Sequence, residues 1–322
     1  MKTFNLQVPK RSLWIFAFIT SGMASAQYTE TINTNKPGFS QGAFAVGKNV
    51  AQVEGSFFYL QEDHNLQQFE RTHLGADFQL RYGLLIERLE INYTSAYNRV
   101  EQSSFSGGGS SNINYANLSR STLGLKYLVF DPAIFFGDKK VNVLSYHANN
   151  KLDWRDLIPA VSVFAGTNVH LGDNNPLVPP LDPTFSPRFE LITQHNFGRW
   201  VVVTNLVADR ITTEFPSYQW FLTVTHSINN KWAVFGEYQG LKSDFYSDDL
   251  ARGGIAYLVT KDWQLDASAT GNFKDTPSVL QVNVGMSYRF DFHKDKEIKQ
   301  KGAGGGNKKP KKQKKIDLDN ED

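Results

Sequence analysis

The sequence of 322 residues contains no cysteine. This absence excludes a disulfide framework, and it excludes a lipid-modified cysteine behind an export signal. The chain also lacks an apolar run of the ~20 residues that a membrane-spanning helix requires. The apolar run near the N-terminus, SLWIFAFIT, is far shorter than that. Any insertion into a membrane must therefore use β-strands.

Signals for catalysis, metal binding and cofactor binding are scarce as well. The seven histidines are scattered without ligand spacing, and no glycine-rich phosphate loop precedes a helix. His226 and Ser227 are adjacent, so on a strand their side chains point to opposite faces and cannot act as a catalytic pair. The sequence therefore predicts no enzyme, no metal site and no cofactor.

The N-terminus has the three parts of a secretory signal peptide, which we assign to residues 1–26. Lys2, Lys10 and Arg11 supply the positive start, and Ala24–Ala26 form an A-x-A cleavage site after the short apolar run. An exported chain is therefore expected.

The charge is unevenly distributed along the chain. Residues 294–322 hold ten lysines, whereas the body between the signal peptide and this tail has 21 basic and 26 acidic residues. The tail is rich in glycine and charge, so it is predicted to be disordered in the periplasm. The tail is either a solvated extension, or its lysines contact lipid phosphates, cell-wall polymer or an acidic periplasmic partner. Nucleic acid is not expected, because no aromatic residues are interleaved with the lysines.

Apolar and polar residues alternate with a period of two throughout residues 49–293, which is typical of strands. In LQVNVGMSYRFDF, Val282, Val284 and Met286 share one face, while Gln281 and Asn283 share the other. Twelve such segments are predicted: 50–61, 71–83, 87–101, 119–130, 159–171, 187–197, 200–212, 217–228, 232–243, 250–259, 263–273 and 278–292. Most reach the ~9–11 residues of a tilted membrane strand.

Short turns alternate with long polar loops along the chain. This pattern is typical of bacterial outer-membrane barrels, in which short turns face the periplasm. The sequence therefore predicts an antiparallel transmembrane β-barrel at 49–293, preceded by a periplasmic segment at 27–48. The stretch 130–159 is too long for the short-turn rim. It is either a periplasmic excursion or hides a strand pair at VNVLSYH (141–147), which would make fourteen strands instead of twelve.

Three tryptophans occur directly after short turns, at the start of three predicted strands. They are Trp200, Trp232 and Trp263. Amphipathic aromatic rings favour the depth of the lipid headgroups, so these three are predicted to belong to an aromatic girdle at the periplasmic interface. The alternative is that these tryptophans belong to the core of a soluble sandwich. Such a core would not favour a position directly after a turn for all three of them.

If the apolar face contacts lipid, the other face lines the lumen, and charged residues lie in phase with it. The predicted lumen-lining residues are Glu54, Asp77, Arg81, Glu90, Lys126, Arg188, Glu190, Asp209, Glu237, Asp266, Arg289 and Asp291. Closure of the barrel between its first and last strands predicts a cluster of Glu54, Arg81 and Arg289 near the periplasmic mouth. These charges either satisfy one another or take part in solute passage.

The stretch TNKPGFSQGAFAVGKNVAQVEGSFFY (34–59) resembles the outer-membrane family named for the meta-pathway of phenol degradation. The positions that carry the resemblance are Pro37, Gly47, Gln52, Glu54 and Tyr59, and FQLRYGLLIERLEI (78–91) continues it. Lys36 stands where arginine is usual in the family. The resemblance implies a channel or transporter, in some members for aromatic or other hydrophobic compounds.

The last predicted strand is also similar to the assembly signal of outer-membrane barrels. Its matching positions are Asn283, Gly285, Tyr288 and Phe290. Such a strand usually ends the chain, whereas about 30 residues follow it here.

These observations predict a monomeric or loosely associated barrel in the outer membrane of a diderm bacterium, with membrane lipid and small solutes as its partners. Twelve strands fall between the ~8 of filled barrels and the 16–18 of open porins. We therefore expect a narrow passive channel, which the N-terminal segment or an inward loop would occlude. The alternative is a scaffold barrel that recruits partners through its loops or tail.

Overall fold

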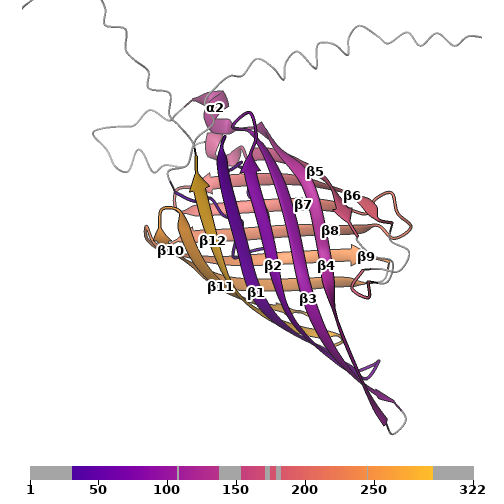
Figure 1. Ribbon diagram of the computed structural model, residues 1–322. Helices are drawn as coiled ribbons and strands as arrows, with labels where there is room; N and C mark the ends of the chain where they lie inside the picture. Colours follow the sequence, from indigo (N-terminus) through magenta and orange to yellow (C-terminus); the bar gives the residue numbers. More distant parts are fainter. Residues whose placement is uncertain are drawn as a thin grey trace, which may run out of the picture.

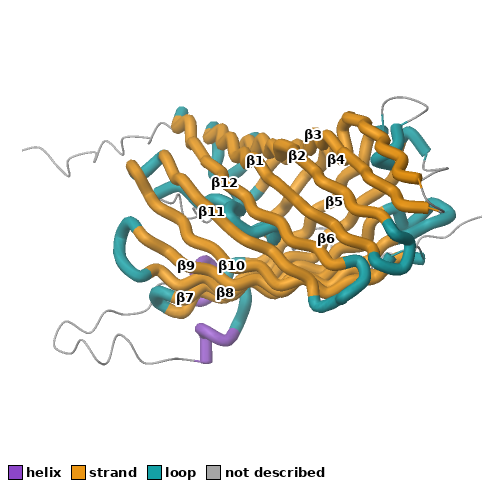
Figure 2. Tube along the Cα trace, turned by 90° about the horizontal axis from the view of Figure 1, so that it is seen from below, coloured by secondary structure: helices purple, strands orange, loops and turns teal. Residues whose placement is uncertain are grey.

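The computed structural model describes residues 31–106, 109–137, 154–170, 175–178, 183–244 and 246–292. The predicted signal peptide, the lysine-rich tail and the candidate strand pair at 141–147 lie outside the described residues. The described chain forms twelve antiparallel strands that close into one barrel (Figures 1 and 2). They are β1 (Val50–His64), β2 (Phe69–Gly83), β3 (Leu89–Ser106), β4 (Gly109–Phe130), β5 (Ala160–Val169), β6 (Phe185–Phe197), β7 (Trp200–Asp209), β8 (Ser217–Ser227), β9 (Trp232–Ser243), β10 (Ser247–Thr260), β11 (Trp263–Asn272) and β12 (Ser278–Asp291).

The barrel closes between β1 and β12, as predicted. Most strand ends lie within three residues of their predicted positions, but the hairpin of β3 and β4 is much longer than expected. β4 was predicted to begin at residue 119 and begins at Gly109. Its first part pairs with β3 alone, because β5 joins β4 only from Thr122 onward, and the hairpin protrudes from the barrel (Figure 1). Serine, asparagine and glycine predominate there, so the segment shows no apolar alternation although its backbone is fully paired to β3.

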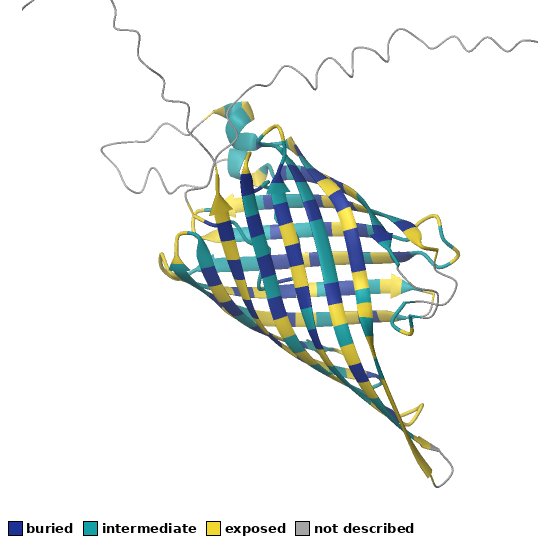
Figure 3. Cartoon of the chain, in the orientation of Figure 1, coloured by how far each residue is buried: buried dark blue, intermediate teal, exposed yellow. Residues whose placement is uncertain are grey.

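The two faces of the wall have opposite polarity. The alternation of buried and exposed residues is visible as bands along the strands (Figure 3). Val284 on β12 is 61% exposed on the outer face, whereas its neighbour Asn283 is 5% exposed on the inner face. A soluble barrel would bury its apolar side chains, so this arrangement fits a hydrocarbon surrounding. The predicted fold is therefore confirmed as a transmembrane β-barrel of the outer-membrane type.

The barrel has two rims with different connections. We call the rim that carries the start of β1 and the end of β12 the terminal rim, and the opposite one the loop rim. Trp200, Trp232 and Trp263 are the first residues of β7, β9 and β11, so all three lie at the terminal rim, as expected. Their contact with lipid headgroups stays a prediction.

The longest connection at the terminal rim joins β4 to β5. Its described parts contain the helix α2 (Pro132–Phe136), which Asp131 caps by accepting from the N–H of Ala133, and the 3-10 helix η2 (Trp154–Leu157). No helix among the described residues is long and apolar enough to cross a membrane.

Residues 31–49, which we call the luminal segment, run inside the barrel before β1 begins. The segment enters at the terminal rim, where the N–H of Ile32 donates to the carbonyl of Lys261. It reaches deep into the lumen around Phe39 and returns to the same rim at Asn49, whose N–H donates to the carbonyl of Gly83. The sequence predicts a periplasmic segment at 27–48 and leaves open that the N-terminal segment occludes the lumen; the described part, 31–48, has the luminal position. The segment lacks a strand or helix pattern, and its position depends on side chains of the wall far away in the sequence.

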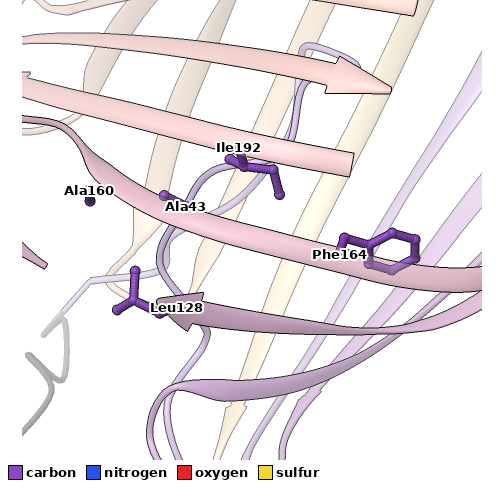
Figure 4. Packing of buried hydrophobic residues seen from close by; sticks show 5 residues of the cluster. All are labelled: Ala43, Leu128, Ala160, Phe164 and Ile192. Carbon is purple, nitrogen blue, oxygen red and sulfur yellow. The ribbon is translucent and has the colours of Figure 1, made fainter. Parts of the chain in front are cut away.

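An apolar cluster holds the returning part of the luminal segment against the wall. Ala43 forms one cluster with four wall residues (Figure 4). Phe44 packs against this cluster. The wall members of the cluster are Leu128, Ala160, Phe164 and Ile192. These apolar residues occupy inward positions on β4, β5 and β6, where the rest of the inner face is polar, because Ala43 and Phe44 cover them.

Candidate functional site in the barrel lumen

Most of the predicted lumen residues lie on the inner face of the wall. Nine of the twelve are buried: Glu54, Asp77, Arg81, Glu90, Lys126, Glu190, Glu237, Asp266 and Arg289. Arg188 and Asp209 are half-buried. Asp291 differs from the prediction in being exposed, because it is the last residue of β12 and lies at the terminal rim.

Four of these side chains form a continuous buried chain of alternating charge. Arg81 is 3.0 Å from Glu54 and 2.8 Å from Glu90, and Lys126 is 3.3 Å from Glu90. All four side chains are fully buried. Because an unpaired buried charge is costly, each member depends on its neighbours, and removing one would leave another uncompensated.

The predicted cluster of Glu54, Arg81 and Arg289 is confirmed in its first pair. The ion pair of Arg289 is instead with Asp262, at 2.6 Å, in the turn between β10 and β11. Arg289 lies close to the terminal rim, so its long side chain reaches this turn. The network around Arg81 grows in the other direction, toward Glu90 on β3 and Lys126 on β4.

Three buried glutamates accept backbone N–H groups of the luminal segment. Glu54 accepts from Asn35 at 3.0 Å and Glu90 accepts from Val46 at 3.0 Å. Glu237 accepts from two consecutive residues, Phe39 and Ser40, at 3.1 Å. A buried N–H without a partner is destabilising, and the luminal segment has no strand ladder to satisfy its own. The glutamates supply these partners with charge-assisted hydrogen bonds.

Neutral amides of the wall complete this pattern. The side-chain carbonyl of Gln194 accepts from the N–H of Ala43 at 2.9 Å. Asn205 makes two bonds to Gln41, accepting from its N–H at 2.8 Å and donating to its carbonyl at 2.9 Å. Gln194 and Asn205 were not among the predicted lumen residues, although both have the inward phase of their strands.

The tip of the luminal segment contacts a second arginine that the sequence analysis missed. Arg252 on β10 forms an ion pair with Glu237 and donates to Thr270 at 2.8 Å. Its guanidinium also lies 3.9 Å from the ring centroid of Phe39, a geometry that favours a cation–π contact. The sequence around Arg252 is rich in glycine and alanine, which gives a weak alternation, and its inward phase was therefore hard to recognise.

Two cavities flank the luminal segment. A larger cavity of about 430 Å³ lies toward the terminal rim, between the segment and β6 to β11. A smaller one of about 60 Å³ lies toward the loop rim. Asn35, Lys36 and Gly38 line both, so this short stretch separates them. Lys36 fixes the stretch to the wall through an ion pair with Asp77 and a hydrogen bond to Ser56 at 3.1 Å.

The lumen has the composition of a passage or binding site. Within the described part of the chain, no group of histidine, aspartate or glutamate side chains could hold a metal ion. The larger cavity is lined by both apolar and polar side chains, with Phe235 and Val203 beside Thr223 and Gln264. Such a mixed lining suits a small solute that carries apolar surface and a few polar groups.

A family model described as "Putative MetA-pathway of phenol degradation" matches residues 34–290, which is most of the chain. Comparison with curated proteins found no match. The family match agrees with the resemblance carried by residues 34–59 and 78–91.

Solved outer-membrane barrels are similar in fold. The COG4313 outer membrane channel from Pseudomonas putida F1 has 11% sequence identity and a TM-score of 0.51, and the match covers 80% of this chain and 100% of that one. The translocator domain of the autotransporter NalP from Neisseria meningitidis has 8% identity and a TM-score of 0.43 over 76% and 89% of the two chains. A mutant of the monoaromatic hydrocarbon channel TodX has 11% identity and a TM-score of 0.38 over 77% and 91%. At these identities the first similarity indicates a shared fold, and the other two carry no argument.

Proposed function

This chain belongs to the MetA-pathway of phenol degradation family, and from that premise we propose that it is a passive outer-membrane channel for small solutes. Hydrophobic and aromatic compounds are included among these solutes. We expect no enzymatic activity. The signal peptide at 1–26 and the lysine-rich tail at 294–322 stay predictions of the sequence.

The observation that carries the proposal is the pair of cavities inside a closed barrel, which lie on the two sides of the stretch Asn35–Gly38 of the luminal segment. The larger cavity falls in the range of ~300–1,000 Å³ that is usual for small-molecule sites. A solute that moves from one rim to the other must pass this stretch.

Passage requires the luminal segment to move while the wall stays intact. The wall is held by its strand ladders, whereas the deep part of the segment is held by side chains such as Glu237, Gln194 and Asn205. Loops held in this way open at a lower free energy than core strands. The ion pair of Lys36 with Asp77 is the contact that must break at the separating stretch.

A scaffold barrel with a permanently sealed lumen is the second candidate. The fully buried chain of charge from Glu54 to Lys126 favours it, because these charges satisfy one another and leave none free to bind a passing solute. In that case an acidic periplasmic partner of the lysine-rich tail would become the first interaction to seek.

Liposome swelling distinguishes the two candidates. The purified chain, with and without residues 294–322, is reconstituted into liposomes and exposed to neutral sugars of increasing size. Entry that falls with solute size supports a channel. No entry above that of protein-free liposomes, from protein verified as folded, supports the sealed scaffold.

A further inference from the structure

We propose that the loop-side half of the lumen contains a carboxylate-binding site formed by Arg120 and Arg188, with small aromatic carboxylates as its ligands. The inference deepens the proposed channel function, on which it rests, because it names the solute class that the route would favour.

Arg120 is a luminal arginine with unused hydrogen-bonding capacity. It lines the loop-side cavity together with Lys36, Asp77 and Arg188, and its side chain is exposed to solvent there. Its guanidinium forms no hydrogen bond or ion pair with any residue that the structure describes. A guanidinium carries five N–H donors in a planar fork, so Arg120 can present two parallel donors to one carboxylate.

Arg120 continues the inward phase of Lys126 and Thr122 on β4, and a β-bulge lies directly beside it. Arg120 pairs with Ala96 on β3 and Leu118 pairs with the next residue, Tyr97, so Ser119 is an extra residue in β4. Leu118 and Arg120 would share a face in a regular strand. The bulge separates them, so that Leu118 lies on the same face as the outward Tyr97 while Arg120 lines the cavity. The bulge turns Leu118 outward and ends the inward alternation at Arg120, and bulges often lie beside functional sites.

Arg188 provides the second cation. It is half-buried and lies 3.8 Å from Glu190 and 3.7 Å from Asp209, which are long ion pairs. Both carboxylates have shorter neutral partners: Gln41 donates to Glu190 at 3.0 Å, and Asn168 donates to Asp209 at 2.6 Å. Donor groups of Arg188 therefore remain for a ligand.

The carboxylates near the two arginines already have other partners. Asp77 is the one carboxylate that lines the cavity, and it is bound by Lys36 and Ser56. Glu190 and Asp209 lie at long ion-pair distance from Arg188 and accept shorter hydrogen bonds from other side chains. These carboxylates therefore leave guanidinium donors of the two arginines open to a solute anion.

The remaining lining defines the kind of anion. Phe39 and Phe164 line the same cavity and give it apolar surface beside its polar lining. The cavity, at about 60 Å³, is large enough for a carboxylate group but not for a whole aromatic acid. We therefore place the carboxylate between Arg120 and Arg188, with the ring of the ligand extending out of this cavity toward the loop rim.

Titration calorimetry on the full chain in detergent tests the site with benzoate, with benzamide as its uncharged isostere and with inorganic phosphate. Benzoate is expected to bind at least about tenfold more tightly than benzamide, because charge-assisted hydrogen bonds to a guanidinium are lost in the amide. Arg120→Gln should weaken benzoate binding by at least about tenfold, and Arg120→Lys should fall between, because the charge stays while the fork is lost. Arg99→Gln, on the protruding hairpin, should change nothing.

Equal binding of benzoate and benzamide, or unchanged benzoate binding in Arg120→Gln, would overturn the site. Phosphate binding as tight as benzoate binding would overturn the carboxylate assignment in favour of a general anion site. Each variant is first checked for the heat-modifiable migration of a folded barrel.

Sugar entry into liposomes distinguishes failure of the carboxylate site from failure of the proposed channel function. If sugars enter through protein that does not bind benzoate, only this inference fails, and if benzoate binds to a barrel that admits no sugar, only the channel proposal fails.

Discussion

The carboxylate of Glu237 accepts the backbone N–H of Phe39 with both of its oxygens, each at 3.1 Å. The two residues are 198 positions apart in the sequence. Glu237 belongs to the wall and Phe39 to the luminal segment, so this contact fixes the deepest part of the segment. Arg252 and Thr223 bind the same carboxylate from neighbouring strands. Glu237 is therefore the link through which the wall controls the position of the segment.

Replacing Glu237 with glutamine should loosen the luminal segment. The change removes the charge that pairs with the buried Arg252. A buried charge left without its counter-charge destabilises the fold by about 3 kcal/mol or more. We expect a loss of that order in the free energy of unfolding, measured by urea titration, together with faster sugar entry into liposomes. Glu101→Gln, which alters an exposed ion pair with Arg99, is the control and should change stability by less than about 1 kcal/mol. Equal effects of the two changes would contradict the role of Glu237.

Gly38→Ala should disturb the same contact from the other side. A Cβ atom at Gly38 would lie 2.5 Å from one carboxylate oxygen of Glu237, which is held by several hydrogen bonds and has little freedom to withdraw. Overpacking of this kind costs about 1–3 kcal/mol. Gly236→Ala is the matched control, because it precedes Glu237 on β9 and a Cβ there meets nothing within 4 Å. If both variants unfold at the same urea concentration as the parent chain, the tip of the segment is not tightly packed.

A charged substitution on the outer face should destabilise the barrel only where lipid covers that face. Val284→Arg on β12 should lower the free energy of unfolding in lipid vesicles by about 2–4 kcal/mol. Ile113→Arg, at an equally apolar and exposed residue of the protruding hairpin, should change it by less than about 0.5 kcal/mol, because the hairpin lies beyond the hydrocarbon. A similar cost at both positions would place the hairpin in the bilayer.

Much of the wall could be predicted from the sequence. Val282, Val284 and Met286 face lipid while Gln281 and Asn283 face the lumen, so β12 alternates with a period of two and its faces can be assigned without any tertiary information. The ion pair of Glu54 with Arg81 could also be predicted, because pairing of the first two strands brings these positions together.

The parts that could not be predicted depend on contacts without a local pattern. Nothing near Phe39 indicates that Glu237 will bind its backbone, so the sequence leaves open whether the luminal segment lies in the periplasm or occludes the lumen. Arg120 was missed for a different reason. It shares the inward phase of Thr122 and Lys126, but it lies at the start of the predicted strand, where the surrounding polar residues show no apolar alternation that would mark the two faces.

The central claim is that solutes pass only when the luminal segment moves, and a reversible cross-link tests it most directly. The hydroxyl oxygens of Ser40 and Thr223 are 2.7 Å apart, so cysteines at both positions can form a disulfide between the segment and β8. The chain has no other cysteine. The measurement is the rate of sugar entry into liposomes that contain the double variant, oxidised and then reduced, with each single variant as a control. The account predicts that oxidation slows entry by at least about tenfold and that reduction restores it, because a tethered segment cannot open the route. Equal rates in the two states, with disulfide formation verified by thiol titration, would contradict it.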